Sequence, residues 1–303
     1  MATQHPLFHG IVTAMVTPLT DQQTLDREGL SRLIEHLIAG GVHGVFPLGT
    51  TGEAPALPTE MQEEVIELTC EQVAGRVPVI VGVTNNSLIE AVRLARVADQ
   101  SGAAAIAAAP PFYYALSQDE ILRYYEKLVA QTRLPLVLYN APANTHDTLH
   151  VDTVRRASQF ANIIGLKDSG FDMDYFREVK NAVSSRADFS LLVGPEELLA
   201  ECIQCGGHGS MAAGSNIFPS LFVSLYEAAV AKDSLRIARL HKEILDFGRA
   251  VYHGRNPLRG LKCGLRALGV CSNVLSEPLS EYTLEETSAV EQYVREHCAS
   301  VSA

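Results

Sequence analysis

The sequence contains no tryptophan, few lysines and no long hydrophobic run. Because a helix that crosses a membrane needs about 20 consecutive apolar residues, we expect no membrane-spanning segment and no membrane partner. Positive charge is also scarce, with 24 Lys and Arg residues against 35 Asp and Glu residues. The formal charge of -11 repels a phosphate backbone, and no basic cluster offsets it, so nucleic acid is not expected as a partner.

Patterns typical of disulfide scaffolds and metal sites are missing as well. The six cysteines have no scaffold spacing, and the first ten residues lack the charged flank and apolar stretch of a secretory signal. We therefore expect a reduced, cytoplasmic protein. One C-x-x-C pair, Cys202 and Cys205 near His208, lacks the second ligand pair of a structural zinc site. The histidines form no cluster at predicted strand ends, so we expect no metal site.

Eight short apolar segments alternate with segments of helical periodicity. Strands that are apolar on both faces and are separated by helices pair in parallel through right-handed crossovers. Eight such units favour an α/β fold of the (β/α)8 TIM-barrel type over an open doubly wound sheet, whose glycine-rich nucleotide signature and P-loop are missing. The predicted strands span residues 11–19, 44–49, 77–83, 104–111, 134–140, 162–168, 189–194 and 207–214.

The helical segments carry their own start and stop signals. Between residues 30 and 38 apolar side chains recur at i, i+3, i+4 and i+7, and Gly40 and Gly41 end that helix. Three later segments open with the spacing of a capping box, in which a side chain and a backbone amide bond reciprocally. These are Thr59 with Gln62, Ser87 with Glu90, and Ser117 with Glu120.

After residue 232 the pattern becomes wholly helical. We predict helices near residues 234–252, 256–269 and 283–298, and no linker rich in Pro, Gly or Ser separates them from the preceding units. The chain is therefore predicted to consist of a catalytic barrel over residues 1–232 and a C-terminal helical extension over residues 233–303 that packs on it.

Lys167 ends an apolar strand, where a further apolar residue would be expected. In a (β/α)8 barrel the carboxyl ends of the strands carry the chemistry, and Tyr139 and the sequence GTTGE at 49–53 also end predicted strands. The other five lysines fall in predicted helices, where a lysine is solvated and protonated. Burial disfavours a charged ammonium, so Lys167 can offer a free amine to a carbonyl. The alternative is a structural ion pair with Asp168 or Glu53.

Neighbouring residues would suit the same chemistry. The Tyr139 hydroxyl can relay protons while an imine forms, although a tyrosine at a strand end often serves only to pack. Thr50 and Thr51 lie in a glycine-flanked turn that can aim N-H groups and hydroxyls at a carboxylate, or that is simply a tight turn. Gly194 ends another strand and would allow a ligand to approach the backbone closely.

Three motifs together carry a family resemblance. GTTGE at 49–53, YNAP at 139–142 and GLKDSG at 165–170, in this order, resemble the dihydrodipicolinate synthase and N-acetylneuraminate lyase family. The resemblance covers nearly the whole chain and favours the imine over the ion pair. It implies that Lys167 forms an imine with pyruvate or a related 2-oxo acid and that Tyr139 relays protons. It further implies that the turn from Gly49 through Thr50 and Thr51 holds the carboxylate, and that no metal or organic cofactor is needed.

The family also implies an assembly. Its members lend a tyrosine from a neighbouring subunit to the proton relay, and in PPFYYALSQ the matching position is Tyr113, with Tyr114 as the alternative. Sharing of this kind requires at least a dimer. The resemblance implies a homotetramer built as a pair of dimers.

Two positions depart from the family pattern. Asn144 stands where the synthases that make the lysine precursor have an arginine, and a neutral amide cannot replace a guanidinium fork that binds a carboxylate. We assign Asn144 to substrate binding. His146 stands where the family usually has glycine, and either lies on the loop surface or places a titratable group near the substrate.

Three functions remain open at this point. The first is a Schiff-base-forming lyase, an aldolase that makes or cleaves a carbon-carbon bond between a 2-oxo acid and an aldehyde. The second is a dehydratase or aldolase of 2-keto-3-deoxy sugar acids that uses the same imine. The third is a non-catalytic sensor of 2-oxo acids, which would gain nothing from keeping Lys167 and Tyr139 together. We favour the first.

Overall fold

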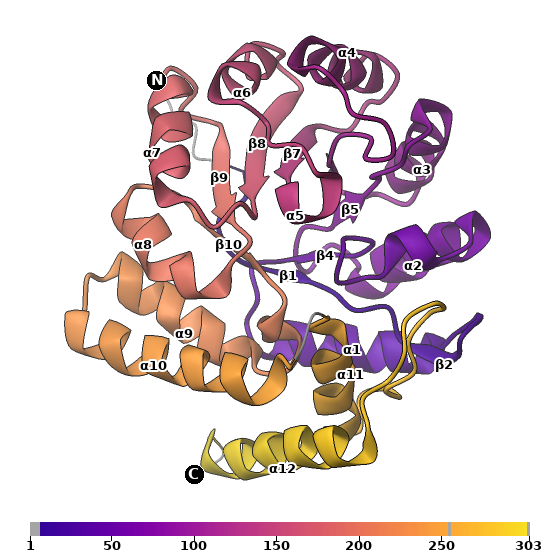
Figure 1. The fold of residues 1–303 in the computed structure, drawn as a ribbon, viewed down its shortest axis with the longest axis vertical. Helices are drawn as coiled ribbons and strands as arrows, with labels where there is room; N and C mark the ends of the chain where they lie inside the picture. The colour runs from indigo at the N-terminus through magenta and orange to yellow at the C-terminus, as the bar shows by residue number, and fades with distance from the viewer. Residues whose placement is uncertain (1–6, 254–255, 302–303) are drawn as a thin grey trace.

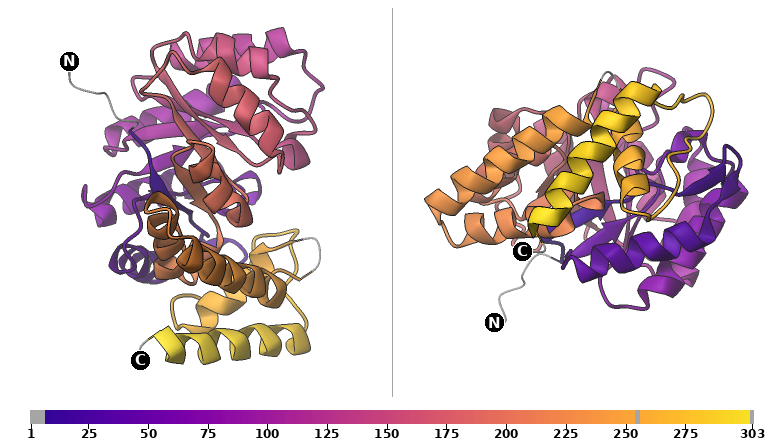
Figure 2. Two further views of the ribbon diagram at one scale, coloured as in Figure 1. Left: turned by 90° about the vertical axis from the view of Figure 1, so that its left-hand side faces the viewer. Right: turned by 90° about the horizontal axis from the view of Figure 1, so that it is seen from below.

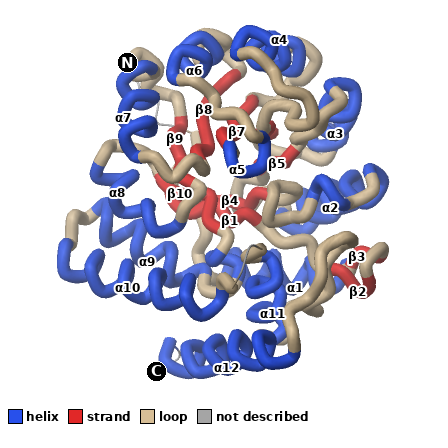
Figure 3. The backbone as a smooth tube through the Cα atoms, in the orientation of Figure 1, coloured by secondary structure: helices blue, strands red, loops and turns tan. Residues whose placement is uncertain are grey.

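Eight parallel strands form the centre of the molecule, and helices surround them (Figures 1 and 3). The computed structural model describes residues 7–253 and 256–301. The strands of the central sheet are β1 (Gly10–Ala14), β4 (Gly44–Phe46), β5 (Ile80–Gly82), β6 (Ala105–Ala108), β7 (Leu136–Asn140), β8 (Ile163–Asp168), β9 (Ser190–Val193) and β10 (Gly209–Ala212).

The sheet closes on itself. Its hydrogen-bonded order is β4-β1-β10-β9-β8-β7-β6-β5, and a parallel bridge between Val45 and Val79 joins the two ends. Each of the eight predicted strands is present, and the closure confirms the predicted (β/α)8 TIM barrel. The open doubly wound sheet, which was the alternative, is wrong.

Helices follow the strands and cover the outside of the barrel. They are α1 (Arg27–Ala39), α2 (Thr59–Val73), α3 (Leu88–Gln100), α4 (Gln118–Val129), α6 (Val151–Ala157), α7 (Met173–Ala182), α8 (Leu199–Gln204) and α9 (Pro219–Val230). The short helix α5 (Pro142–Thr145) lies at the carboxyl end of β7. Sequence periodicity did not predict α5, because four residues are too few to show a repeat of 3.6.

Side chains of the strands alternate between two apolar layers. Outward side chains pack against the helices. The inward ones form a separate cluster that includes Val12, Phe46, Val137 and Met211, so the barrel is filled and is not a pore.

Three helices follow the barrel. These are α10 (Ser234–Val251), α11 (Leu258–Ala267) and α12 (Leu284–Val301), which agree with the predicted helical segments. Helix α10 packs along α9, and α12 packs on α11 at the end of the molecule opposite α4 and α6 (Figures 1 and 2). The predicted boundary at residue 232 falls between α9 and α10, and the division into two domains there stays a prediction.

Some local expectations are wrong. Of the three predicted capping boxes, only that of Ser117 and Glu120 is complete. At the start of α2 the N-cap is Pro58 and not Thr59. The side-chain carboxamide of Gln62 donates to the carbonyls of Ala54 and Leu57 in the preceding loop. Ser87 accepts one bond from the Glu90 amide without the reciprocal bond. A small hairpin, β2 (Leu19–Asp21) with β3 (Thr24–Leu25), was not predicted because its strands are too short to show alternation.

Part of the chain start lies outside the described residues. The absence of a secretory signal was expected from the first ten residues, and residues 1–6 lie outside the described residues. Among residues 7–253 and 256–301, no helix is both long enough and apolar enough to cross a membrane.

We predict that alanine substitution of two glycines of the extension changes the free energy of unfolding in opposite directions. A Cβ on Gly248, inside α10, would meet no heavy atom closer than 3.8 Å, whereas a Cβ on Gly260, inside α11, would lie 1.9 Å from the Val251 carbonyl oxygen. Gly248→Ala should raise the free energy of unfolding by up to about 1 kcal/mol. Gly260→Ala should lower it by about 2 kcal/mol or more, because α11 must move away from α10.

Denaturant unfolding of both variants measures the two changes. If the two substitutions had equal effects, the close packing of α11 on the end of α10 would be contradicted.

Candidate active site

Lys167 and Tyr139 lie side by side on neighbouring strands. They are direct partners in the parallel register of β7 and β8, and both side chains point into the barrel near its carboxyl end. Lys167 is 5% exposed and Tyr139 is 6% exposed. The Lys167 ammonium lies 4.4 Å from the centroid of the Tyr139 ring and 4.9 Å from that of Phe46. The amine is therefore bordered by aromatic faces, which attract a cation without neutralising it.

The structural ion pair considered for Lys167 is not formed. Asp168, the next residue along β8, accepts hydrogen bonds from the Asn140 amide at 2.7 Å and from the Gly170 N-H at 3.0 Å. Glu53 pairs with Lys262 instead. Among the described residues, no carboxylate lies within ion-pair distance of Lys167.

The Tyr139 hydroxyl lies within a small hydrogen-bond network. It is 3.3 Å from the Thr50 hydroxyl. Burial alone would raise the pKa of Tyr139, but the charge of Lys167 and the polar side chains near the phenol, those of Thr50 and Ser169 among them, outweigh burial and lower that pKa. A phenol of this kind gives up and regains a proton more readily than an isolated one.

The turn after β4 brings Thr50 to this network. Leu48 and Glu53, at its two ends, have φ values of 59° and 57°, a left-handed conformation that is uncommon outside glycine. The Thr17 hydroxyl donates to the Gly52 carbonyl at 2.7 Å and fixes the turn to the chain after β1. Among the described residues, the backbone N-H groups of Thr50 and Thr51 have no acceptor, so both are available to an anion.

Ser169 is a residue of the site that the sequence did not single out. A Cβ on Gly194 would lie 2.0 Å from the Ser169 hydroxyl and 3.4 Å from Lys167 Cε. The absence of a side chain at Gly194 therefore makes room for Ser169 and Lys167, and not directly for a ligand. The signal in the sequence was the position of Ser169 two residues after Lys167, on the same side of the extended chain.

A cavity of about 250 Å³ opens beside Tyr139 and Thr50. Gly49 and Asn144 line it, together with Thr84, Ala109, Phe112 and residues of α5. None of its lining residues carries a charged side chain, and Lys167 is not among them. The Asn144 carboxamide has no hydrogen-bond partner in the described part of the chain. It is thus available to a ligand in the cavity.

His146 lies on the surface, which is one of the two positions considered for it. It follows α5 with a φ of 63°, and its side chain is exposed. A left-handed residue at the end of a helix is most often glycine, which gives a physical reason for the glycine that the resemblance leads one to expect there.

Tyr113 does not reach the site of its own chain. Its side chain is 77% exposed and that of Tyr114 is 73% exposed, and the two rings contact each other edge to face. The Asn86 side chain accepts hydrogen bonds from the N-H groups of Phe112 and Tyr113 and fixes the loop. Phe112 lines the cavity, whereas Tyr113 is not among its lining residues.

Two of the other five lysines, which were predicted to be solvated on helices, do not have this position. Lys262 lies in α11 but is 0% exposed, because it faces Glu53 and not solvent. Lys232 lies in the turn between α9 and α10 and has a φ of 56°. The periodicity of α11 could not show a buried partner that lies far away in the sequence.

The C-x-x-C pair has structural contacts. The Cys202 thiol donates to the Gly209 carbonyl, and burial raises its pKa to about 12. His208 Nδ1 accepts from the Leu191 N-H. Among the described residues, no group of three or more His, Cys, Asp or Glu side chains has the arrangement of a metal site.

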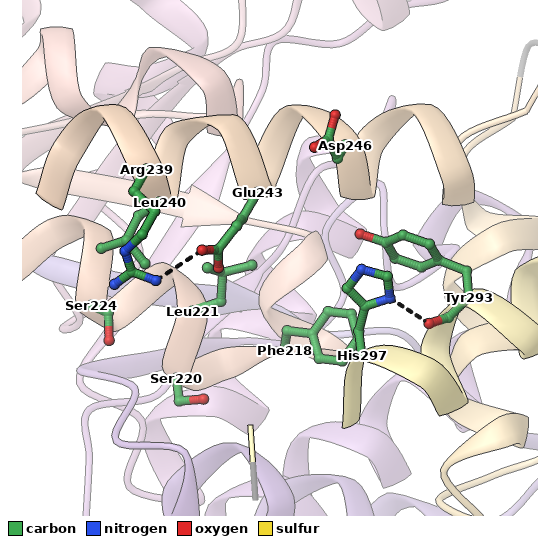
Figure 4. A pocket seen from close by; sticks show the side chains of 10 residues that line it. All are labelled: Phe218, Ser220, Leu221, Ser224, Arg239, Leu240, Glu243, Asp246, Tyr293 and His297. Carbon is green, nitrogen blue, oxygen red and sulfur yellow. Dashed lines mark hydrogen bonds and ion pairs between the residues drawn. The ribbon is translucent and has the colours of Figure 1, made fainter. Parts of the chain in front are cut away.

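A larger cavity of about 480 Å³ lies between α9, α10 and α12 (Figure 4). Its charged side chains are satisfied by one another or by neighbours: Arg239 pairs with Glu243, Asp246 pairs with Lys242 and Arg249, and the His297 ring stacks on Tyr293. This cavity therefore offers no nucleophile that resembles Lys167.

Glu196 is a second residue that the sequence did not identify. It follows β9 and is buried beneath the loop after β10. Its carboxylate accepts hydrogen bonds from the N-H groups of Ala213 and Gly214, and from the Tyr252 hydroxyl at 3.0 and 3.2 Å. Burial nevertheless dominates and raises the pKa of Glu196 to about 7.

A buried lysine beside a tyrosine, at the carboxyl ends of the strands of a (β/α)8 barrel, defines a class of enzyme. This arrangement is typical of Schiff-base-forming lyases of the aldolase type, in which an amine and a phenol lie side by side.

The chain belongs to the dihydrodipicolinate synthetase family, whose model matches residues 7–297. A 4-hydroxy-tetrahydrodipicolinate synthase of Methanopyrus kandleri is 34% identical over 274 residues, which cover 90% of each chain. A relative of the same name from Thermomicrobium roseum is 35% identical over 274 residues, covering 90% of this chain and 89% of the relative.

Solved structures agree with this placement. Dihydrodipicolinate synthase of Bacteroides thetaiotaomicron is 42% identical, with a TM-score of 0.93 over 96% of this chain and 99% of the other. YagE, a prophage protein of Escherichia coli K12 solved in complex with pyruvate, is 28% identical, with a TM-score of 0.91 over 96% and 98% of the two chains. The predicted family and lyase activity are confirmed, and these comparisons do not favour the sugar-acid dehydratase or the sensor.

We predict that Glu196 makes stability depend on pH. Its folded-state pKa lies above its ordinary value of 4.5, so the folded protein binds the proton more tightly than the unfolded chain does. The stabilisation is present at low pH and is lost as pH rises toward about 7. Between about pH 5 and about pH 8, the free energy of unfolding of the wild type should fall by about 2 to 3 kcal/mol relative to Glu196→Gln.

Denaturant unfolding of both proteins at the two pH values measures this difference. Parallel pH profiles for the wild type and Glu196→Gln would contradict the assignment.

Proposed function

We propose that this protein makes or cleaves a carbon-carbon bond beside an enamine formed on Lys167 from pyruvate or a related 2-oxo acid. The observation that carries the proposal is the contact between Lys167 and Tyr139 on neighbouring strands. The resemblance and the structure of YagE, which was solved with pyruvate, support the choice of a 2-oxo acid. The lysine itself supplies the covalent chemistry, so the reaction needs neither a metal nor an organic cofactor.

In the synthetic direction the uncharged amine of Lys167 attacks the keto carbon. A carbinolamine forms, its hydroxyl leaves as water after taking up a proton, and the imine remains. Loss of a proton from the adjacent carbon gives the enamine, which attacks the carbonyl carbon of an aldehyde. Hydrolysis of the product imine returns the free amine. In the cleavage direction the same steps run in reverse.

Each of these steps moves a proton, and Tyr139 is placed to carry it. Its hydroxyl contacts both Lys167 and Thr50. We assign Thr50 to the same relay, because its hydroxyl lies 3.3 Å from the phenol and Thr50 also lines the cavity. The lowered pKa of Tyr139 supports both roles.

The turn from Gly49 to Gly52 would bind the carboxylate of the 2-oxo acid. The N-H groups of Thr50 and Thr51 have no acceptor among the described residues. Two adjacent N-H groups that point at one anion orient it as well as bind it. The keto carbon is thereby directed toward Lys167, and Gly194 leaves room for the lysine and Ser169 beside it.

Asn144 would contact the aldehyde partner. It lines a cavity without charged side chains, and its carboxamide can both donate to and accept from a hydroxyl or carbonyl group. This supports a partner whose end near α5 is neutral.

The site would be completed by a second copy of the chain. We propose that Tyr113 enters the relay of its partner in a dimer, and that two dimers form a homotetramer in the cytoplasm. The exposure of Tyr113 and Tyr114, two large aromatic side chains in contact, supports an interface at this loop.

Borohydride trapping tests the role of Lys167. Reduction in the presence of pyruvate should leave a 1-carboxyethyl group on Lys167 of the wild type, and peptide mass spectrometry locates it. Lys167→Met should show no adduct and a turnover at least about 1000-fold lower. Lys127→Met is the matched control, because Lys127 is exposed on α4. A wild type that remains unmodified with pyruvate and with longer 2-oxo acids would exclude the proposed imine.

Subunit mixing tests the role of Tyr113. In a hybrid dimer of Lys167→Met and Tyr113→Phe subunits, one site contains an intact Lys167 and receives an intact Tyr113 from its partner. If both variants are nearly inactive alone, dissociation and reassembly of an equal mixture should restore about a quarter of the wild-type activity. A mixture no more active than its components would show that Tyr113 does not act across the interface.

A further inference from the structure

One buried ion pair fastens the turn of the site to the C-terminal extension. Glu53 Oε1 lies 2.6 Å from Lys262 Nζ, and both side chains are 0% exposed. Glu53 ends the GTTGE turn, and Lys262 lies in α11. The pair therefore joins the loop after the second strand of the barrel to a helix formed near the end of the chain.

Further hydrogen bonds occupy both charged groups. The second oxygen of the Glu53 carboxylate accepts from the N-H of Ser276 at 2.7 Å and from its hydroxyl at 2.8 Å. The Lys262 ammonium also donates to the Val274 carbonyl at 2.6 Å. Both additional partners belong to the segment after α11, and Ser276 ties the turn to this segment directly.

Stability alone gives a weak reason for such a pair. Apolar side chains of similar volume often stabilise a protein as well as a buried ion pair does, because the two charges lose their hydration on burial. An ion pair does, however, fix the position of its members more closely than apolar contact does, since its hydrogen bonds have direction.

The turn itself needs to be fixed. Leu48 and Glu53 both have left-handed backbones, with φ values of 59° and 57°, and neither is a glycine. Residues in this conformation persist where the surrounding structure imposes it, and they are frequent at binding sites. Contacts beyond the turn must therefore hold Glu53, and these are the bonds to Lys262 and Ser276.

We propose that Glu53 and Lys262 form a positioning pair for the carboxylate-binding turn. The pair holds the N-H groups of Thr50 and Thr51 in the direction that an anionic substrate requires. Lys262 also neutralises the Glu53 carboxylate, which would otherwise repel that substrate. This inference rests on the proposed function, since it assigns the turn to substrate binding.

Three variants separate positioning from stability. Lys262→Met leaves a buried carboxylate unpaired, whereas the double variant Glu53→Gln with Lys262→Met leaves no charge unpaired. Arg266→Met is the matched control, because Arg266 lies on the same helix and pairs with Glu291 of α12 at the surface. For each protein we would measure the Tm, the pyruvate concentration that half-saturates borohydride trapping, and hydrogen exchange of the turn.

Hydrogen exchange reports on the turn without any substrate. The N-H groups of Gly52 and Glu53 donate to the carbonyls of Gly49 and Thr50 at 3.1 Å, so their exchange is slow while the turn keeps its shape. In the double variant we expect the Tm to return close to that of the wild type. The exchange of these amides should remain about 10-fold faster, and half-saturation should need about 10-fold more pyruvate.

The outcomes are distinct. Arg266→Met should match the wild type in both exchange and half-saturation. A double variant that regains the wild-type Tm, exchange and half-saturation together would overturn the proposal and leave the pair a purely structural role. If Lys262→Met does not fold, the double variant still gives the answer. If the wild type traps no 2-oxo acid, the proposed function fails, and hydrogen exchange then shows separately whether the pair fixes the turn.

Discussion

The structure around the site depends on one constraint, the burial of the Lys167 amine without a carboxylate partner. A buried ammonium is normally paired, because its loss of hydration is otherwise uncompensated. Here the rings of Tyr139 and Phe46 border the amine, and Gly194 leaves the space that the lysine and Ser169 occupy. Asp168, the acid nearest to Lys167 in the sequence, accepts a hydrogen bond from Asn140 and does not pair with Lys167. The surroundings thus keep the amine close to the Tyr139 phenol and away from a counter-ion.

The two buried lysines of the described chain show how surroundings divide one residue type between two roles. Lys167 contacts aromatic rings, a phenol and the edge of an open site, whereas Lys262 contacts a carboxylate and a backbone carbonyl. The first arrangement gives the amine no carboxylate partner, whereas the second pairs the ammonium with a carboxylate and a carbonyl oxygen. Burial alone does not identify a reactive lysine. The groups that contact the buried amine distinguish Lys167 from Lys262.

The barrel and the residues at its strand ends could be predicted from the sequence, because the signals for them are local. Eight apolar segments separated by helices define the barrel, and its topology brings Lys167, Tyr139 and Thr50 to the same end. Contacts between distant segments leave no local trace. Nothing near Lys262 indicates Glu53, and nothing near Glu196 indicates Tyr252. Short elements such as α5 and the β2-β3 hairpin are missed for another reason, since they are too brief to show a period.

The bond between Glu53 and the C-terminal extension also affects the order in which the protein can be completed during synthesis. The ribosome releases the amino-terminal part of a chain first, and this part can begin to fold before the rest appears. Glu53 emerges early, whereas its partners Lys262 and Ser276 emerge near the end. In a nascent chain the barrel strands can already be paired while the carboxylate still faces water. The turn at residues 49–53 thus reaches its final form only when nearly the whole chain has been made.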